Sequence, residues 1–137
     1  MGNSLSESLL LIRKHLLQIS SLTDIVEERI YSHHFYDFDN ETTKMPLVIV
    51  DYNGGDTNYG MQQQKINIEI YCYSKNSSAE SLRLYDIIYS NLHAAQLLNS
   101  SITVKGYAYE ASRPISNYNN QAKAWLVLGR FSLNLAG

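Results

Sequence analysis

The first part of the chain carries apolar residues at helical spacing. Steps of three and four residues predict a helix over about residues 4–20, with one apolar face formed by Leu5, Leu9, Ile12, Leu16 and Ile19. A short second helix follows, for which Ser21 or Thr23 can serve as the N-terminal cap. After Arg29-Ile30-Tyr31 the chain becomes polar and aromatic, and we expect it to cross in extended form toward a sheet.

Two strands are predicted next. Residues 45–52 are apolar without alternation, as in a strand that is covered on both faces. Residues 62–74 alternate, and the two predicted faces carry Ile66, Ile68, Ile70 and Cys72 on one side and Lys65, Asn67, Glu69, Tyr71 and Tyr73 on the other. The intervening Asn53-Gly54-Gly55-Asp56 is typical of a turn, because Asn-Gly readily adopts positive φ angles. These segments therefore predict a long hairpin whose polar loop continues through Gly60.

The second half of the chain predicts one helix and two further strands. Ser77 or Ser78 can cap a helix that reaches about residue 93. In the strand that follows, Ile102, Val104, Gly106 and Ala108 share a face, while Lys105, Tyr107 and Tyr109 share the other. The last strand spans about residues 121–135. One face carries Ala124, Leu126 and Leu128, and the other carries Trp125, Val127, Phe131 and Leu133. A polar loop is expected between them, over residues 113–120.

The predicted element order is α-α-β-β-α-β-β in a single domain of residues 1–137. Strands separated by helices in this order favour an α+β fold, with an antiparallel or mixed four-stranded sheet and the helices packed on one face. The opposite face would carry the tyrosines together with Trp125 and Phe131. An apolar face that one helix layer leaves uncovered is typical of a subunit contact.

The amino-acid composition also favours a protein that contacts other subunits. Charged residues make up only 18% of the chain, and there are 11 tyrosines beside 3 phenylalanines and 1 tryptophan. Protein interfaces are depleted in charge and enriched in tyrosine. The net charge of −2 and the scattered basic residues disfavour sequence-specific nucleic-acid binding, although several subunits could still form a charge-lined channel. The single cysteine excludes an internal disulfide, and no stretch of sequence predicts a membrane span.

No combination of residues predicts catalysis, and we expect neither a metal nor a cofactor. His33 and His34 lie near Asp37 and Asp39, but adjacent residues of an extended chain point to opposite faces. Gly54-Gly55 precedes a strand, whereas a phosphate-binding loop precedes a helix. Cys72 continues an apolar row and is expected in the core. The chain is therefore predicted not to be an enzyme.

Two surfaces are predicted to make contacts instead. The candidate subunit interface consists of Tyr71, Tyr73, Tyr107, Tyr109, Trp125 and Phe131. Cross-strand packing within one subunit is an equally good explanation of the paired tyrosines. The second surface is the hairpin loop, which is a candidate for contact with a neighbouring subunit or a channel: Asn53, Gly54, Gly55, Asp56, Asn58 and Tyr59.

The chain resembles the tail terminator, or tail completion, proteins of long-tailed bacteriophages. The resemblance rests on an N-terminal helix, on Arg29-Ile30-Tyr31, on the segment Met45-Pro46-Leu47-Val48-Ile49-Val50, and on Lys65-Ile66-Asn67-Ile68-Glu69-Ile70-Tyr71-Cys72-Tyr73-Ser74 before a helix. It covers nearly the whole chain as a pattern of elements. Residues 33–44 depart from it, because they are longer and more polar than the family pattern.

The resemblance implies a virion protein, assembled in the host cytoplasm and located at the neck of the tail. Members of this family form a ring, usually a homohexamer, that caps the head-proximal end of the tail tube and joins it to the head-tail connector. DNA can pass through the lumen of such a ring. A ring needs heterologous contacts, in which one patch meets a different patch on the neighbouring subunit. The alternatives are a head-completion or neck adaptor protein on the portal side, and a small cytosolic ligand-binding module.

Overall fold

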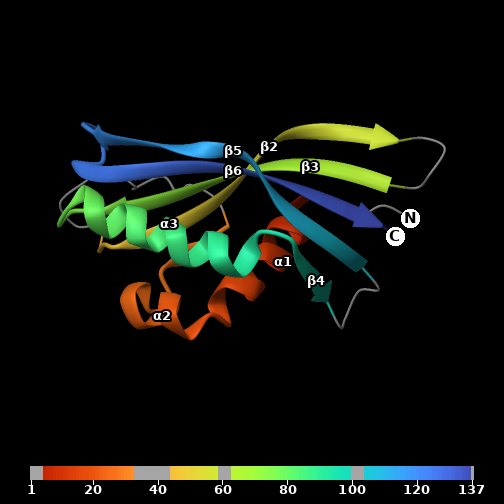
Figure 1. The fold of residues 1–137 in the computed structure, drawn as a ribbon, viewed down its shortest axis with the longest axis horizontal. Helices are drawn as coiled ribbons and strands as arrows, with labels where there is room; N and C mark the ends of the chain where they lie inside the picture. The colour runs from red at the N-terminus through yellow and green to blue at the C-terminus, as the bar shows by residue number, and fades with distance from the viewer. Residues whose placement is uncertain (1–4, 33–43, 59–62, 100–103, 137) are drawn as a thin grey trace.

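The computed structural model of the chain describes residues 5–32, 44–58, 63–99 and 104–136. Figure 1 shows a long sheet with its helices on one side. In chain order the elements are α1 (Leu5–Leu17), α2 (Ser20–Val26), β1 (Ile30–Tyr31), β2 (Leu47–Asn58), β3 (Gln63–Ser74), α3 (Ser78–Leu92), β4 (Ala95–Asn99), β5 (Val104–Asn119) and β6 (Ala124–Ala136).

The sheet order is β1-β2-β3-β6-β5-β4, with β1 parallel to β2 and every other pair antiparallel. This mixed sheet confirms the predicted α+β fold. The predicted number of four strands is too low, because β4 and the two-residue β1 extend the two edges. These short strands contain too few residues for an alternating pattern, so the sequence suggested only connections there.

β5 is also longer than predicted. The polar segment expected as a loop over residues 113–120 continues the strand as far as Asn119. Pairing with β6 shifts register between Glu110 and Ser112 and again before Ile115, so this half of β5 is irregular. Irregularity and Pro114 are typical of an edge strand, where polar residues face solvent. The polar composition that suggested a loop reflects this exposed edge.

The two glycines of the first hairpin do not form its turn, which corrects the prediction. β2 and β3 do pair as a long antiparallel hairpin, from Leu47 opposite Tyr73 to Asn58 opposite Gln63. Gly54 and Gly55, with φ angles of 85° and 154°, lie inside β2, where the register shifts between Tyr52 and Gly55. Positive φ angles occur in β-bulges as well as in turns. Here they accompany a bulge, in which β2 contains one residue more than the facing part of β3.

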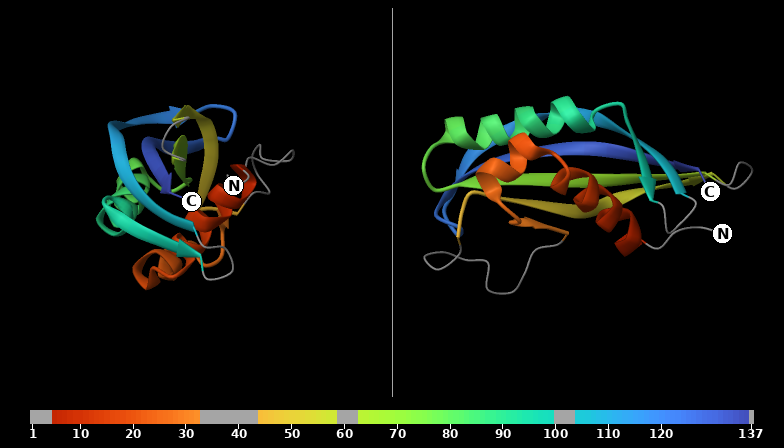
Figure 2. Two further views of the ribbon diagram at one scale, coloured as in Figure 1. Left: turned by 90° about the vertical axis from the view of Figure 1, so that its right-hand side faces the viewer. Right: turned by 90° about the horizontal axis from the view of Figure 1, so that it is seen from below.

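The main core lies between the sheet and the helices. The predicted row of Ile66, Ile68, Ile70 and Cys72 faces this core and is buried, with at most 3% exposure. The helices contribute a matching apolar layer that includes Leu16, Leu22, Leu84 and Ile88. As predicted, the Ser77 hydroxyl caps α3 by accepting a hydrogen bond from the Glu80 N–H at 3.1 Å. The two views of Figure 2 show the strongly curved sheet with α1, α2 and α3 on its concave side.

A smaller apolar cluster lies on the other side of the sheet. It is limited to one end and consists of Leu47, Ile49, Tyr73, Ala122, Ala124 and Leu126. Tyr31, Met45 and Tyr71 pack against it and are partly buried. β2 is therefore covered on both faces along its first residues, as its continuous apolar sequence predicted.

Candidate assembly surface

The predicted tyrosine face exists, but its two pairs have different environments. Tyr71 and Tyr73 point away from the helices, and their rings stack at 6.2 Å with an interplanar angle of 5°. Tyr73 is only 3% exposed and belongs to the small cluster. The Tyr71 hydroxyl donates a hydrogen bond to Glu69 at 3.1 Å. Burial, and then the negative charge of Glu69, raise the pKa of Tyr71 to about 12. This pair therefore packs largely within the subunit.

Tyr107 and Tyr109 are exposed at 43% and 42%. They pair with Asn134 and Ser132 of β6, and so lie on the same sheet face as Asn67 and Lys65. Between them and the Tyr71 pair, Arg130 donates a hydrogen bond to Glu69 at 3.3 Å. The face away from the helices thus has an apolar end, a charged middle and an aromatic end, and the aromatic end is available for contact.

Trp125 and Phe131 do not lie on the face predicted for them. Opposite residues of antiparallel strands share a face, and Phe131 pairs with Ile68 while Trp125 pairs with Ser74. Both side chains therefore belong to the helix side. Phe131 is fully buried in the main core. The prediction was wrong because both rows of β6 are apolar, so its sequence does not indicate which row faces the helices.

Trp125 nevertheless remains at the surface. It is 36% exposed, and its ring meets Tyr118 edge-on at 5.1 Å. Tyr118 is 46% exposed, so the two rings form an aromatic pair near the β5–β6 turn. The Trp125 carbonyl accepts a hydrogen bond from the Ser81 hydroxyl at 3.0 Å, which fixes the strand next to α3.

The predicted hairpin-loop surface is described only in part. Asn53 and Gly55 are exposed and Gly54 is half-buried, all three within or beside the bulge of β2. The backbones of Asp56 and Asn58 continue the strand opposite Lys65 and Gln63. Their side chains and all of Tyr59 lie outside the described residues.

A polar and aromatic cluster joins α3 to β5, and sequence reasoning did not identify it. We call it the arginine cluster; its members are Tyr85, Tyr89, His93, Glu110 and Arg113. Glu110 accepts hydrogen bonds from the Tyr85 hydroxyl and, at 2.9 and 3.2 Å, from Arg113 Nη1. The Glu110 N–H donates to His93 Nδ1 at 2.9 Å. The Arg113 guanidinium lies 5.5 Å from the centre of the Tyr89 ring, which stacks on His93 at 4.9 Å.

Exposure within the arginine cluster is uneven. The Glu110 side chain is only 8% exposed, whereas that of Arg113 is 72% exposed. The buried carboxylate is therefore neutralised by a cation at the surface. Burial and the bond to Glu110 raise the pKa of Tyr85 well above its ordinary value, and Glu110 also raises the pKa of Arg113. In the sequence Glu110 and Arg113 are three residues apart, but Arg113 was expected to begin a loop, so the contact of this pair with α3 was missed.

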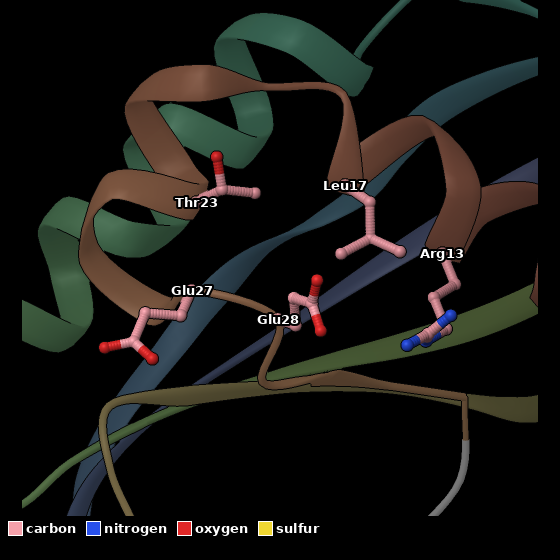
Figure 3. A pocket seen from close by; sticks show the side chains of 5 residues that line it. All are labelled: Arg13, Leu17, Thr23, Glu27 and Glu28. Carbon is pink, nitrogen blue, oxygen red and sulfur yellow. The ribbon is translucent and has the colours of Figure 1, made fainter.

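A recess opens on the helix side of the molecule, between α1 and the end of α2. It has a volume of about 580 Å³ and is lined by Arg13, Leu17, Thr23, Glu27 and Glu28. Figure 3 shows that the side chains of Arg13, Leu17 and Glu28 point toward one common space. Arg13 Nε donates to the carbonyl of Ile30, which ties the recess to β1. We call this feature the α1–α2 recess.

Metal and thiol chemistry find little support in the described part of the chain. No group of three or more His, Cys, Asp or Glu residues there could hold a metal ion. His33, His34, Asp37 and Asp39 lie outside the described residues. Cys72 is a buried free cysteine, and burial raises the pKa of its thiol. In the same described segments, no helix has the length and apolar character needed to span a membrane.

Neither a protein family nor a curated protein sequence matches this chain. Among solved structures, a chain described as "Virion of native gene transfer agent (GTA) particle" is similar over its whole length. The TM-score is 0.67 at 12% sequence identity, and the match covers 98% of this chain and 100% of that chain. The two chains therefore share the same overall fold.

Proposed function

We propose that this protein is a structural component of a phage-like virion and acts there as a tail terminator. The observation that carries the proposal is the full-length likeness to a chain of a gene transfer agent virion. The match covers 98% of this chain and 100% of that chain, so the likeness concerns the whole fold, and the proposed role is an analogy drawn from that fold. The resemblance to tail terminator proteins, noted from the element pattern, agrees with it.

In this role the protein forms a homohexameric ring on the head-proximal end of the tail tube. The ring stops tube growth and offers its other side to the head-tail connector, while DNA passes through the lumen. The surface suits an assembly protein, because exposed aromatic residues occur on two separate regions: Tyr107 with Tyr109, and Tyr118 with Trp125. Tyrosine and tryptophan are the residue types most enriched at protein interfaces.

A ligand-binding module is less well supported. Small-molecule sites are mostly enclosed and apolar. The α1–α2 recess is lined by two glutamates, an arginine and a threonine beside a single leucine. Such a polar lining is better suited to another protein surface than to a small apolar ligand.

The test is reconstitution with the tail tube protein of the same particle. The purified chain is added to growing tubes, and tube length and tube ends are measured by negative-stain electron microscopy. We expect shorter tubes, each with a ring of density at one end, and an oligomer near six times 15.6 kDa by native mass spectrometry. A chain that stays monomeric and leaves tube length unchanged would contradict the proposal. Binding to the connector without binding to tubes would indicate a neck adaptor instead.

A further inference from the structure

The α1–α2 recess contains one carboxylate, that of Glu28, that is not paired with any described residue. Arg13 Nε donates to the Ile30 carbonyl, and Arg29 Nε donates to the Pro46 carbonyl at 2.9 Å. Arg29 is only 12% exposed, whereas its partner Glu27 is 66% exposed. Within the described part of the chain, no hydrogen bond or ion pair involves the Glu28 carboxylate. Glu27 is thus paired with Arg29, and Arg13 Nε is bound to a backbone oxygen, so Glu28 is the carboxylate that the recess offers to another molecule.

The arginine cluster presents the opposite character. All the hydrogen bonds that Arg113 makes to described residues start from Nη1, so Nε and Nη2 remain for an acceptor on another molecule. Glu110 and the Tyr89 ring hold the guanidinium in place before any partner arrives. Arginine and tyrosine dominate the energetics of protein interfaces, and a planar guanidinium suits a carboxylate partner.

These two surfaces belong to different edges of the sheet. The recess adjoins β1, the first strand of the sheet order, through Arg13 and Ile30. Arg113 lies on β5 beyond Ala108, where pairing with β4 has ended, so this part of β5 is an open edge on the described sheet. Two different and mutually complementary patches are what a heterologous, head-to-tail contact requires, and such a contact closes into a ring when the rotation allows it.

Building on the proposed ring, we infer that neighbouring subunits join through these patches, with the arginine cluster of one copy seated in the α1–α2 recess of the next. Arg113 pairs with the Glu28 carboxylate, and the rings of Tyr89 and His93 cover Leu17. The occupant of the recess is thus a second copy of this chain. The recess is lined by polar side chains and by the apolar Leu17. The arginine cluster has the complementary groups, a guanidinium next to an aromatic ring.

Charge reversal tests the pairing directly. We expect Glu28→Lys and Arg113→Glu each to weaken assembly by more than about tenfold in midpoint concentration, because like charges then meet at every contact. Mixing the two variants restores the ring. In an alternating ring every contact is then either wild type or the reversed pair, so the mixed ring contains an even number of subunits. Arg83→Glu, an exposed reversal elsewhere on α3, serves as the matched control and leaves assembly unchanged.

Arg113→Glu also removes the cation that is paired with Glu110, so a second measurement leaves Arg113 unchanged. Ala111→Cys and Glu28→Cys each place an exposed thiol beside one patch, while Cys72 stays buried. A short bismaleimide linker should join the two variants when they are mixed, and neither variant alone. Cross-linking of either variant with itself would indicate a symmetric two-fold contact and overturn the inference.

The two proposals fail in different ways. If rings cap tubes but ignore the charge reversals and give no mixed cross-link, the head-to-tail pairing is wrong and the terminator function stands. If no oligomer and no capping are found for the unaltered chain, the proposed function itself fails.

Discussion

Tyr85 occupies the space that a side chain on Gly129 would need. A β-carbon built on Gly129 would lie 2.1 Å from Cε1 of the Tyr85 ring, far inside any normal contact. Tyr85 is 1% exposed and its hydroxyl bonds to Glu110, so the ring has little room to move. The absence of a side chain at Gly129 in β6 therefore allows α3 to approach the sheet. It also makes room for the Tyr85 ring, whose hydroxyl belongs to the arginine cluster.

Gly129→Ala is expected to destabilise the protein by at least about 2 kcal/mol, because overpacking a filled core displaces either the helix or the strand. Urea unfolding followed by far-UV circular dichroism measures the loss. In a Tyr85→Phe background the ring remains and so does the penalty, whereas in a Tyr85→Ala background Gly129→Ala should cost much less. Equal penalties in both backgrounds would show that the Tyr85 ring is not the obstacle.

The bulge in β2 allows a comparison between adjacent glycines. A β-carbon at Gly54 meets nothing within 4 Å, whereas at Gly55 it would lie 2.0 Å from the Lys65 carbonyl oxygen. Gly54→Ala should therefore cost only the strain of a positive φ angle, about 1–2 kcal/mol. Gly55→Ala should cost clearly more, because the β2–β3 ladder itself must shift. Thermal unfolding of the two variants measures both losses of stability. A larger loss for Gly54→Ala than for Gly55→Ala would contradict the bulge geometry.

These glycines also show what the sequence could and could not predict. In β3 the isoleucine row and the polar row differ, so the faces were predicted correctly from alternation alone. In β6 both rows are apolar, and the orientation of Trp125 and Phe131 follows only from pairing with β3. Asn53-Gly54-Gly55 indicated positive φ angles but not whether they form a turn or a bulge. The arginine cluster depends on contacts between α3 and β5, which no local pattern contains.

Alkaline pH should destabilise the protein through its buried tyrosines. The pKa of Tyr71 is raised from 10.0 to about 12, mainly by burial and next by Glu69, and the pKa values of Tyr73 and Tyr85 are raised as well. Above pH 10 the unfolded chain loses tyrosine protons that the folded chain keeps, so the free energy of unfolding falls as pH rises from about 10 to about 12. Below pH 10 these groups make no pH-dependent contribution.

Denaturant unfolding at a series of pH values measures this slope. Tyr71→Phe should reduce the slope between pH 10 and 12, and Tyr107→Phe, which changes an exposed tyrosine, serves as the control. An unchanged slope in Tyr71→Phe would contradict the burial of its hydroxyl beside Glu69.

Cys72 should react only when the protein unfolds. Its side chain is fully buried among the core residues, and burial raises the pKa of the thiol, which lowers its thiolate fraction. We expect an aromatic disulfide reagent at neutral pH to label the folded chain more than about 100-fold more slowly than the chain in denaturant. Mass spectrometry at timed intervals measures the labelling. Rapid labelling of the folded chain would place Cys72 outside the core.

A substitution of Trp125 can show whether this side chain is needed for assembly or for folding. Its ring is 36% exposed and contacts Tyr118 edge-on, so Trp125→Lys should leave the subunit folded and cost no more than about 1.5 kcal/mol. If this aromatic pair contacts the tube or a neighbouring subunit, the same change abolishes assembly, because a lysine is then buried in place of an indole. Phe131→Lys is the contrasting variant, since a charge placed in the fully buried core should unfold the chain. Size-exclusion chromatography with far-UV circular dichroism distinguishes the outcomes. A folded Trp125→Lys protein that still forms full-size rings and still caps tubes would remove this pair from the assembly surface.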